Sequence, residues 1–374
     1  MYLRKAIATG LFVLTLAGIS KCLLLPRWMP TLAVLPQVER SDIEKVFRGI
    51  FDGRVACLVW GNPEELQQFY DASVASGSWA LEHETGRVRC FQEWVRKRSV
   101  EISSVESTVR VVDFGMSKER LWGSVCHNLV LTYTHEPGEK PNVMGLRTIH
   151  WMELVPKGDR WLVRKDWFWD PLSSSLNPQI PVAELSDKSG DQGRDLGPAR
   201  AQAMAKGSFN RVAAVRYADR YCGVTVGESD GRYNPQYRDF TYVGGDCTNF
   251  VSQVLADKNA GGLAMDAAWN YRNGSGTEAW LCAESFVRYM IQSGRGTLLK
   301  RGKYAEVAKF VEQLVPGDVV AFEENGAVKH VMVVTGKNQH GHVVVNSHSA
   351  DRYHVPWDMG FEADAVYWLI RING

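Results

Sequence analysis

The residues best suited to chemistry in this sequence surround one cysteine. Between Gly244 and Gln253 a Gly-Gly turn leads into Asp246 and then Cys247, with apolar residues following at helical spacing. Asp is a favoured N-cap, so we expect a helix that carries Cys247 on its first turn. Unpaired backbone N–H groups and the helix dipole would there lower the thiol pKa, and the N–H of Cys247 could serve an oxyanion hole. The alternative is a small, buried and inert cysteine at a helix start.

A histidine further along the chain is the candidate base. His330 opens an apolar run after an acidic hairpin at 323–326, which predicts a strand with the imidazole at its mouth. A helix packed on that sheet could bring a thiol to it. On the next strand Asn346 and His348 share a face by alternation, so either could orient the imidazole. The alternative is that these residues only begin and end ordinary strands.

Metal binding is a weaker interpretation. His340, His342, His348 and His354 could be considered as zinc ligands, but no cysteine or carboxylate accompanies them at tight spacing. We therefore expect no metal and no cofactor.

The elements needed to position these residues are found in the C-terminal part, which we place at 207–374. Helical periods cover about 212–221, the Cys247 segment and about 281–293, and apolar strand-like runs cover 315–322, 329–336, 342–348 and 366–372. A helix with the nucleophile comes first and an antiparallel sheet with the histidine follows, which predicts an α+β domain.

The N-terminal part, 38–172, has helical periods first and alternating strand patterns afterwards. This order resembles the small cone-shaped domains of the cystatin-like and nuclear-transport-factor-like type, in which helices cover a bent sheet. We interpret it as a non-catalytic accessory module and expect His127, His135 and His150 to be ordinary sheet residues. A segment rich in Ser, Pro, Asp and Gly, 173–206, reads as a linker.

The first 27 residues resemble a secretory signal or, as we favour, an uncleaved signal-anchor, because Arg4 and Lys5 precede an apolar run. The remaining chain is then expected outside the cytoplasm, either secreted or attached to a membrane by this segment. Lysine plus arginine, 43, nearly balances aspartate plus glutamate, 42, so nothing indicates a nucleic-acid partner. The seven cysteines include no CxxC pair, and their odd number leaves at least one thiol outside intramolecular disulfides.

Four segments together resemble the amidase domain family of Gram-positive bacteria, which is similar to the NlpC and CHAP members of the papain-like cysteine peptidases. They are Gly245–Gln253, Tyr233–Tyr237, the Gly-Asp-Val at 317–319 with Lys329–Val331, and Ser347–Arg352. The resemblance covers about 208–374. The segment 256–262 and the tryptophan-containing loop beyond it differ from the family in length, so substrate specificity does not transfer.

The resemblance implies a cysteine amidase or peptidase with Cys247 as nucleophile and His330 as general base. Asn346 and His348 fall where CHAP domains carry two polar residues one apart; Asn346 is the favoured partner of His330. Oxyanion and substrate-binding roles are assigned to Tyr242, Tyr237, Asn234 and Asp246.

The reaction implied is thiolate attack on an amide, an acyl-enzyme and release by water, with peptide or peptidoglycan amides as substrates. Two other functions compete with it: a membrane-tethered, non-catalytic binding or scaffold protein, and an acyl transferase. The sequence leaves the oligomeric state open.

Overall fold

The computed structural model describes residues 39–117, 119–172, 209–360 and 365–374, and all of them belong to one compact unit. The expected signal or anchor at 1–27 and the expected linker at 173–206 lie outside the described residues. Within the described ranges, no helix is both long and apolar enough to cross a membrane.

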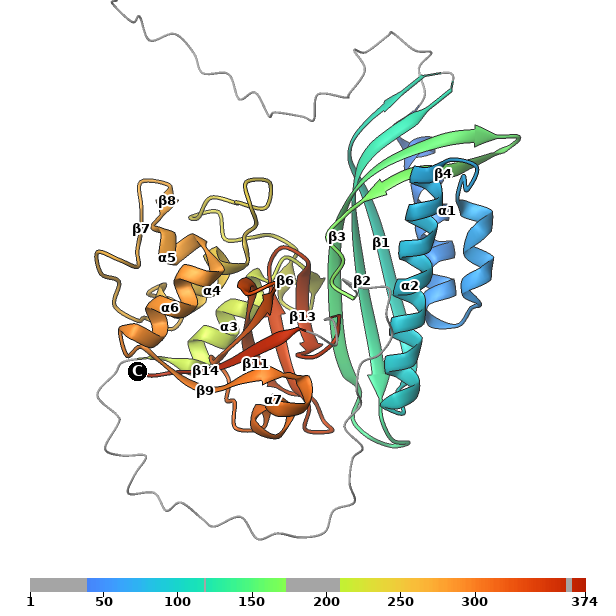
Figure 1. Ribbon diagram of the computed structural model, residues 1–374. Coiled ribbons are helices and arrows are strands. Elements are labelled where there is room, and N and C mark those ends of the chain that lie inside the picture. The colour runs from blue at the N-terminus through green and yellow to red at the C-terminus, as the bar shows by residue number, and fades with distance from the viewer. Residues whose placement is uncertain (1–38, 118, 173–208, 361–364) are drawn as a thin grey trace, which may run out of the picture. The chain divides into compact units, whose positions relative to one another are not determined.

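In the N-terminal part, helices cover one face of four antiparallel strands (Figure 1). The elements are α1 (Arg40–Val59), the 3-10 helix η1 (Pro63–Phe69), α2 (Ala75–Lys97), β1 (Glu101–Met116), β2 (Leu121–Thr134), β3 (Asn142–Lys157) and β4 (Arg160–Trp167). Helices therefore precede strands as predicted.

Alternation along β2 and β3 directs one set of side chains toward the helices. Leu129, Leu131, Met144 and Leu146 are buried there with Phe47 of α1 in a single apolar core. Burial of alternate residues is what a strand with one face on a helical layer requires.

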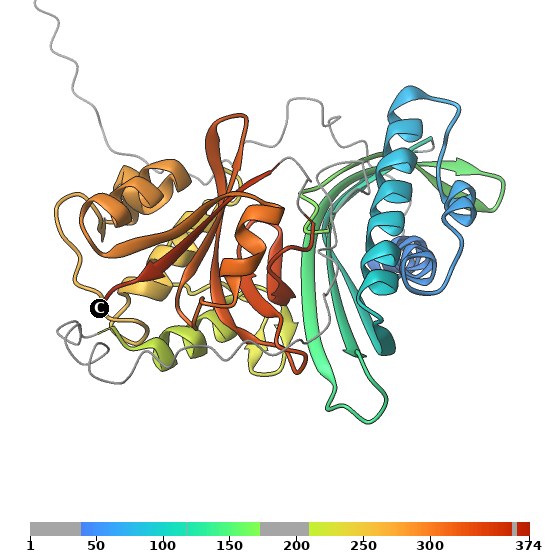
Figure 2. The same cartoon turned by 60° about the horizontal axis from the view of Figure 1, so that its bottom comes forward.

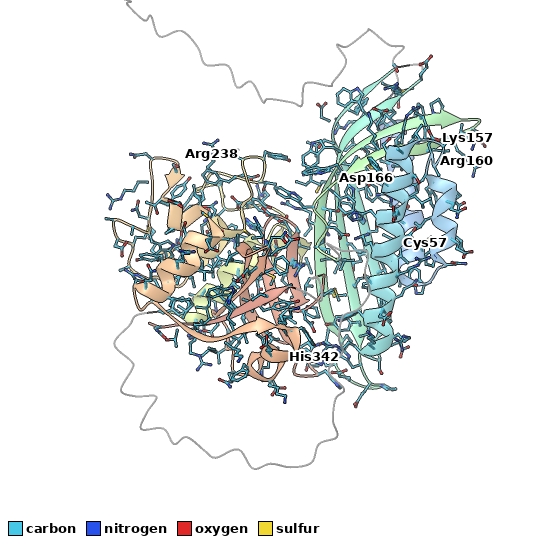
Figure 3. All side chains as sticks on the ribbon, in the orientation of Figure 1. Cys57, Lys157, Arg160, Asp166, Arg238 and His342 are labelled. Atoms are coloured by element: carbon cyan, nitrogen blue, oxygen red, sulfur yellow. The ribbon has the colours of Figure 1, made fainter. Side chains whose placement is uncertain are left out.

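Two of the sheet histidines are part of a buried polar cluster under this layer. His127 and His150 pack against Phe51, with ring centroids 4.6 and 4.8 Å apart. His150 Nδ1 lies 3.0 Å from Asp166, and Asp166 also accepts a hydrogen bond of 2.8 Å from Arg54. Figure 3 labels Asp166 among the side chains of the N-terminal part. Buried charges are tolerated when they are paired in this way.

The C-terminal part places helices on both faces of a twisted antiparallel sheet. Its helices are α3 (Arg211–Tyr221), α4 (Cys247–Ala256), α5 (Glu278–Leu281), α6 (Ala283–Gln292) and α7 (Tyr304–Val311). Its strands are β9 (Gly296–Lys303), β10 (Val319–Glu324), β11 (Ala327–Lys337), β12 (Val343–Ser347), β13 (Asp351–Pro356) and β14 (Val366–Ile372), and two small hairpins are formed by β5 (Thr225–Val226) with β6 (Ser229–Asp230) and β7 (Tyr271–Arg272) with β8 (Ser275–Gly276).

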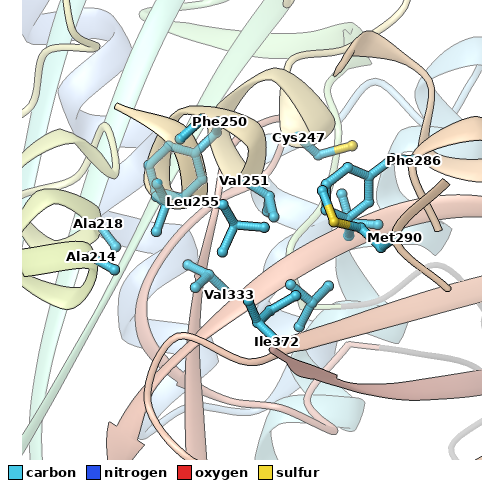
Figure 4. Packing of buried hydrophobic residues seen from close by; sticks show 14 of the residues in the cluster. Ala214, Ala218, Cys247, Phe250, Val251, Leu255, Phe286, Met290, Val333 and Ile372 are labelled. Carbon is cyan, nitrogen blue, oxygen red and sulfur yellow. The ribbon is translucent and has the colours of Figure 1, made fainter. Parts of the chain in front are cut away.

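Strand β11 is buried on both faces, which explains its unbroken apolar run. Val331 and Val333 pack with α4 and α6 in one core, where Figure 4 shows Val251 and Leu255 of α4 above Val333. Met332 and Val334 point the other way, into a second core closed by α7, which Figure 2 shows on the sheet from a turned view.

One sheet joins the two parts of the chain. The strand order is β1-β2-β3-β13-β12-β11-β10-β14-β9, with β4 also paired to β3, so β3 and β13 form the junction. There Arg147 lies opposite Asp351 and donates to it over 2.6 Å, and Tyr233 donates to the same carboxylate over 2.6 Å. The chain is thus a mixed α+β protein with a large antiparallel sheet, and the N-terminal part is continuous with the rest through that sheet.

We predict that Arg147→Met destabilises the protein by about 3 kcal/mol, because it leaves the buried Asp351 carboxylate without its cation. Urea unfolding followed by circular dichroism measures the change. The matched control is Arg232→Met, which removes an exposed pair with Asp230 and should leave the midpoint almost unchanged. Equal effects of the two substitutions would contradict the role given to Arg147.

Candidate active site

The start of α4 is built around Asp246. Cys247 is the first residue of the helix and Asp246 occupies the N-cap position, as predicted, but its carboxylate does not cap the helix backbone. Instead, Oδ1 accepts hydrogen bonds of 2.9 Å from the Phe240 backbone N–H and from the Asn249 side-chain amide. The Asp246 backbone N–H donates to Ser349 Oγ over 2.6 Å. Hydrogen bonds with Phe240, Asn249 and Ser349 therefore fix the position of Asp246, the residue before Cys247.

The Gly-Gly turn that leads to this point uses backbone angles that favour glycine. Gly244 and Gly245 have φ of 109° and 110°, a region that residues with a Cβ rarely adopt. The Gly245 N–H closes the turn on the Phe240 carbonyl over 3.2 Å. The turn delivers the chain into α4 at an angle that leaves both glycines on the wall of a cavity.

His348 is fully buried and links Asp246 to the backbone of Tyr221. Its Nδ1 lies 2.6 Å from Asp246 Oδ2 and its Nε2 lies 2.6 Å from the Tyr221 carbonyl. The ring is stacked between Tyr233 and Phe250, with centroids 3.5 and 4.0 Å away. Because Nε2 faces a carbonyl it must donate, so the Nδ1–carboxyl contact also needs a proton, on the ring or on the acid. His348 therefore ties the segment after β12 to the start of α4.

Cys247 and His330 border the same cavity. Its volume is about 370 Å³, and Lys329, Phe322 and Ser349 also line it. The Cys247 thiol lies 3.7 Å from Thr248 Oγ1 and accepts a hydrogen bond from the backbone of Val331, the residue after His330. The start of α4 and strand β11 thus meet at this cavity. The strand begins at Ala327, so His330 lies inside it, opposite Phe322 of β10, and does not open it as the sequence suggested.

Burial sets the resting charge of these two groups. It raises the pKa of the Cys247 thiol, and the hydrogen bonds from Thr248 and Val331 oppose that rise without cancelling it. Burial, assisted by the Arg352 guanidinium, lowers the pKa of His330 to about 3. The expectation of a lowered thiol pKa is therefore wrong for the resting molecule, because loss of solvation outweighs the favourable helix position. At neutral pH the groups are a thiol and a neutral imidazole.

The two expected orienting residues have other partners. The Asn346 amide donates to Asp219 over 2.9 Å, and its oxygen accepts from the His354 backbone over 2.8 Å. In the strand register Asn346 lies opposite Val333, further along β11 than His330. Asn346 and His348 each hold neighbouring chain segments together through these contacts, which do not reach His330.

The expected oxyanion and substrate-binding residues separate into buried and exposed groups. Tyr237 donates to Asp257 over 2.8 Å, and the Asn234 amide donates to Tyr217 over 2.8 Å, so both support the packing around α4. Tyr242 is exposed and its ring meets Trp151 edge-on at 5.7 Å.

The four histidines considered for zinc do not gather at one point. His348 engages Asp246, and His354 Nε2 lies 2.9 Å from Asp219. The rings of His340 and His342 pack against His135 of the N-terminal part, at 4.6 and 5.2 Å. In the described part of the chain, no group of three or more His, Cys, Asp or Glu side chains has the arrangement of a metal site.

The sequence did not predict that the N-terminal part would build one wall of the cavity. Phe168, Trp169 and Asp170, which follow β4, line it together with His83 of α2. Asp170 is fixed there by His83 Nε2 at 3.0 Å and Arg87 Nε at 3.2 Å. The aromatic run 167–169 at a strand end was the one available signal, because aromatic side chains with a solvent-facing position often serve binding.

Comparison with known proteins agrees with the motif around Cys247. Residues 208–370 match the family described as "Putative amidase domain". The uncharacterized protein YhbB of Bacillus subtilis (strain 168) is 30% identical over 151 residues, which cover 38% of this chain and 42% of YhbB. The chain therefore matches less than half the length of this relative. The resemblance to the amidase domain family is confirmed for residues 208–370.

A solved structure, the intermembrane space region of the chloroplast protein ARC6, matches 36% of this chain and 98% of its own length. The sequence identity is 13% and the TM-score is 0.24, a value too low to indicate a shared fold.

We predict that Cys247 reacts as a buried thiol when the cavity is empty. Its rate of alkylation by iodoacetamide, measured by peptide mass spectrometry on the full chain, should keep rising with pH into the alkaline range, because burial holds the thiol protonated. The exposed Cys282 is the internal reference and should react faster near neutral pH. A high, flat rate for Cys247 between about pH 5 and pH 8 would instead indicate a preformed thiolate–imidazolium pair.

Proposed function

We propose that this protein hydrolyses amide bonds in peptides, with Cys247 as the nucleophile and His330 as the general base. The observation that carries the proposal is the shared cavity of these two residues in a segment that matches an amidase family. A neutral imidazole beside a thiol can accept the thiol proton, and a proton acceptor is what an unactivated cysteine needs.

The chemistry would proceed in two stages. As a substrate carbonyl enters the cavity, His330 takes the proton from Cys247 while the sulfur bonds to the carbonyl carbon. The Cys247 backbone N–H at the start of α4 would stabilise the oxyanion. Collapse breaks the carbon–nitrogen bond, the amine leaves with the proton from His330, and a thioester remains. Water then attacks the thioester with His330 again as base, which restores the thiol and releases the acid.

The arrangement agrees with a papain-like domain of the NlpC and CHAP type. In that arrangement a cysteine at the start of a helix packs on an antiparallel sheet whose strand carries the histidine, and α4 with β11 follows this order. Asn346, the favoured orienter, is engaged by Asp219, so we assign it to structural support.

For substrate and location we propose peptide amides of peptidoglycan, outside the cytoplasm. The support is the sequence alone: the charged and apolar residues of 1–27 and the resemblance to cell-wall amidases. The N-terminal segment would keep the protein at a membrane surface facing that polymer.

The test is the release of new amino groups from soluble peptidoglycan fragments by the full chain. Cys247→Ala should abolish release, and His330→Gln should slow it by about 10² to 10⁴, the usual contribution of a general base. Cys282→Ala, which removes an exposed thiol elsewhere on the molecule, is the matched control and should keep full activity.

Release that continues in Cys247→Ala would refute the proposed mechanism. Fragments that bind without any amine release would favour the binding or scaffold protein. A product in which an added amine replaces water at the acyl group would identify a transferase.

A further inference from the structure

The N-terminal part carries a run of solvent-facing tryptophans on the sheet face opposite its helices. Trp151 of β3 and Trp167 of β4 lie directly across from each other, with ring centroids 4.8 Å apart. Trp169, just after β4, meets Trp167 at 5.9 Å. Trp167 is 54% exposed and Trp169 37% exposed. These side chains lie outside the apolar core that α1 and α2 close.

The run continues onto the loop that precedes the candidate nucleophile. Tyr242 packs edge-on against Trp151 at 5.7 Å and is 58% exposed, and its neighbour Val243 is also exposed. We name Trp167, Trp169, Trp151 and Tyr242 the aromatic row. The chain passes directly from Tyr242 into Gly244 and Gly245, which line the Cys247 cavity, and Trp169 lines that cavity too.

Sheet stability alone does not account for the row. A cross-strand aromatic pair stabilises a sheet mainly through the area it buries, and Trp167 leaves about half of its surface in water. Contiguous exposed aromatic side chains beside a cavity are characteristic of a binding surface. An indole ring or a phenol offers a flat apolar face with a polar edge, so a matching ligand has flat apolar faces rimmed by hydroxyl or amide groups.

We propose that the aromatic row binds a glycan strand, with successive sugar rings stacked on its side chains. A pyranose ring presents a face of C–H groups and a rim of hydroxyl and acetamido groups, which is the chemistry that the row matches. The proposal rests on the proposed function, since the glycan would be the polymer whose attached peptide enters the Cys247 cavity. The row would then hold the substrate polymer at the cavity mouth, and the N-terminal part would contribute to substrate recognition.

The experiment measures binding separately from catalysis. The full chain carrying Cys247→Ala is titrated with soluble β-1,4-linked N-acetylglucosamine oligomers, which contain no peptide, by isothermal titration calorimetry. Trp167→Ala and Trp169→Ala should each weaken binding by about tenfold, the effect of losing one stacked ring. Trp60→Ala and Trp79→Ala are the matched controls, since these tryptophans are 68% and 70% exposed but belong to the helical side of the sheet. Their affinity should equal that of the parent.

A second variant protects the test against misfolding. If a tryptophan substitution unfolds the protein, Tyr242→Ala takes its place in the experiment. Tyr242 lies on a loop, outside the sheet, and its substitution should also weaken oligomer binding. Absence of oligomer binding by the parent, or equal weakening by all four tryptophan variants, would overturn the proposal. It would equally be overturned if the parent bound phosphatidylglycerol vesicles through Trp167 and not the oligomers, which would assign the row to a membrane surface.

The two proposals fail in different ways. If oligomer binding depends on Trp167 but the chain releases no amine from peptidoglycan, glycan binding by the aromatic row is supported and the hydrolase is refuted. Amine release without oligomer binding would support the hydrolase and refute glycan binding by the aromatic row.

Discussion

The buried contact between Asp246 and His348 is the constraint on which the candidate site depends. Asp246 directly precedes Cys247, and its two oxygens are used by His348, Asn249 and the Phe240 backbone. Stacking between Tyr233 and Phe250 fixes the orientation of the His348 ring that contacts Asp246. A cysteine at the start of a helix has little freedom when the preceding residue is held in this way. The thiol is consequently directed toward the backbone of Val331 in β11.

The same buried contact connects Cys247 to the N-terminal part. Tyr233, which stacks on His348, donates to Asp351, and Asp351 is paired with Arg147 of β3. The pairing of β3 with β13 that makes this contact also brings the residues after β4 to the cavity wall. Loss of the sheet junction would therefore disturb both the support of Cys247 and the surface that faces it. The candidate catalytic residues and the proposed binding surface therefore depend on the same strand pairing.

Local patterns predicted the parts of this structure that depend on neighbouring residues. The helix start at Cys247 and the strand that carries His330 follow from short-range periodicity and capping, although that strand begins at Ala327 and not at His330. The order of helices before strands in the N-terminal part was also readable. The roles of His348 and Asn346 were not readable, because alternation places them on one face but says nothing about the loops that reach them. The cavity wall made by Trp169 and Asp170 depends on a strand pairing between residues about 200 positions apart, which no local pattern encodes. The thiol pKa was misjudged because helix position is visible in the sequence and burial is not.

In the proposed mechanism Cys247 attacks an amide carbonyl and holds the acyl group as a thioester. The most direct measurement is peptide mass spectrometry of the full chain, quenched in acid during turnover on peptidoglycan fragments. We expect an acyl adduct on the peptide that contains Cys247, sensitive to hydroxylamine and lost when the substrate is exhausted. Turnover with the Cys247 peptide unmodified at every time point, or an adduct on another side chain, would contradict it.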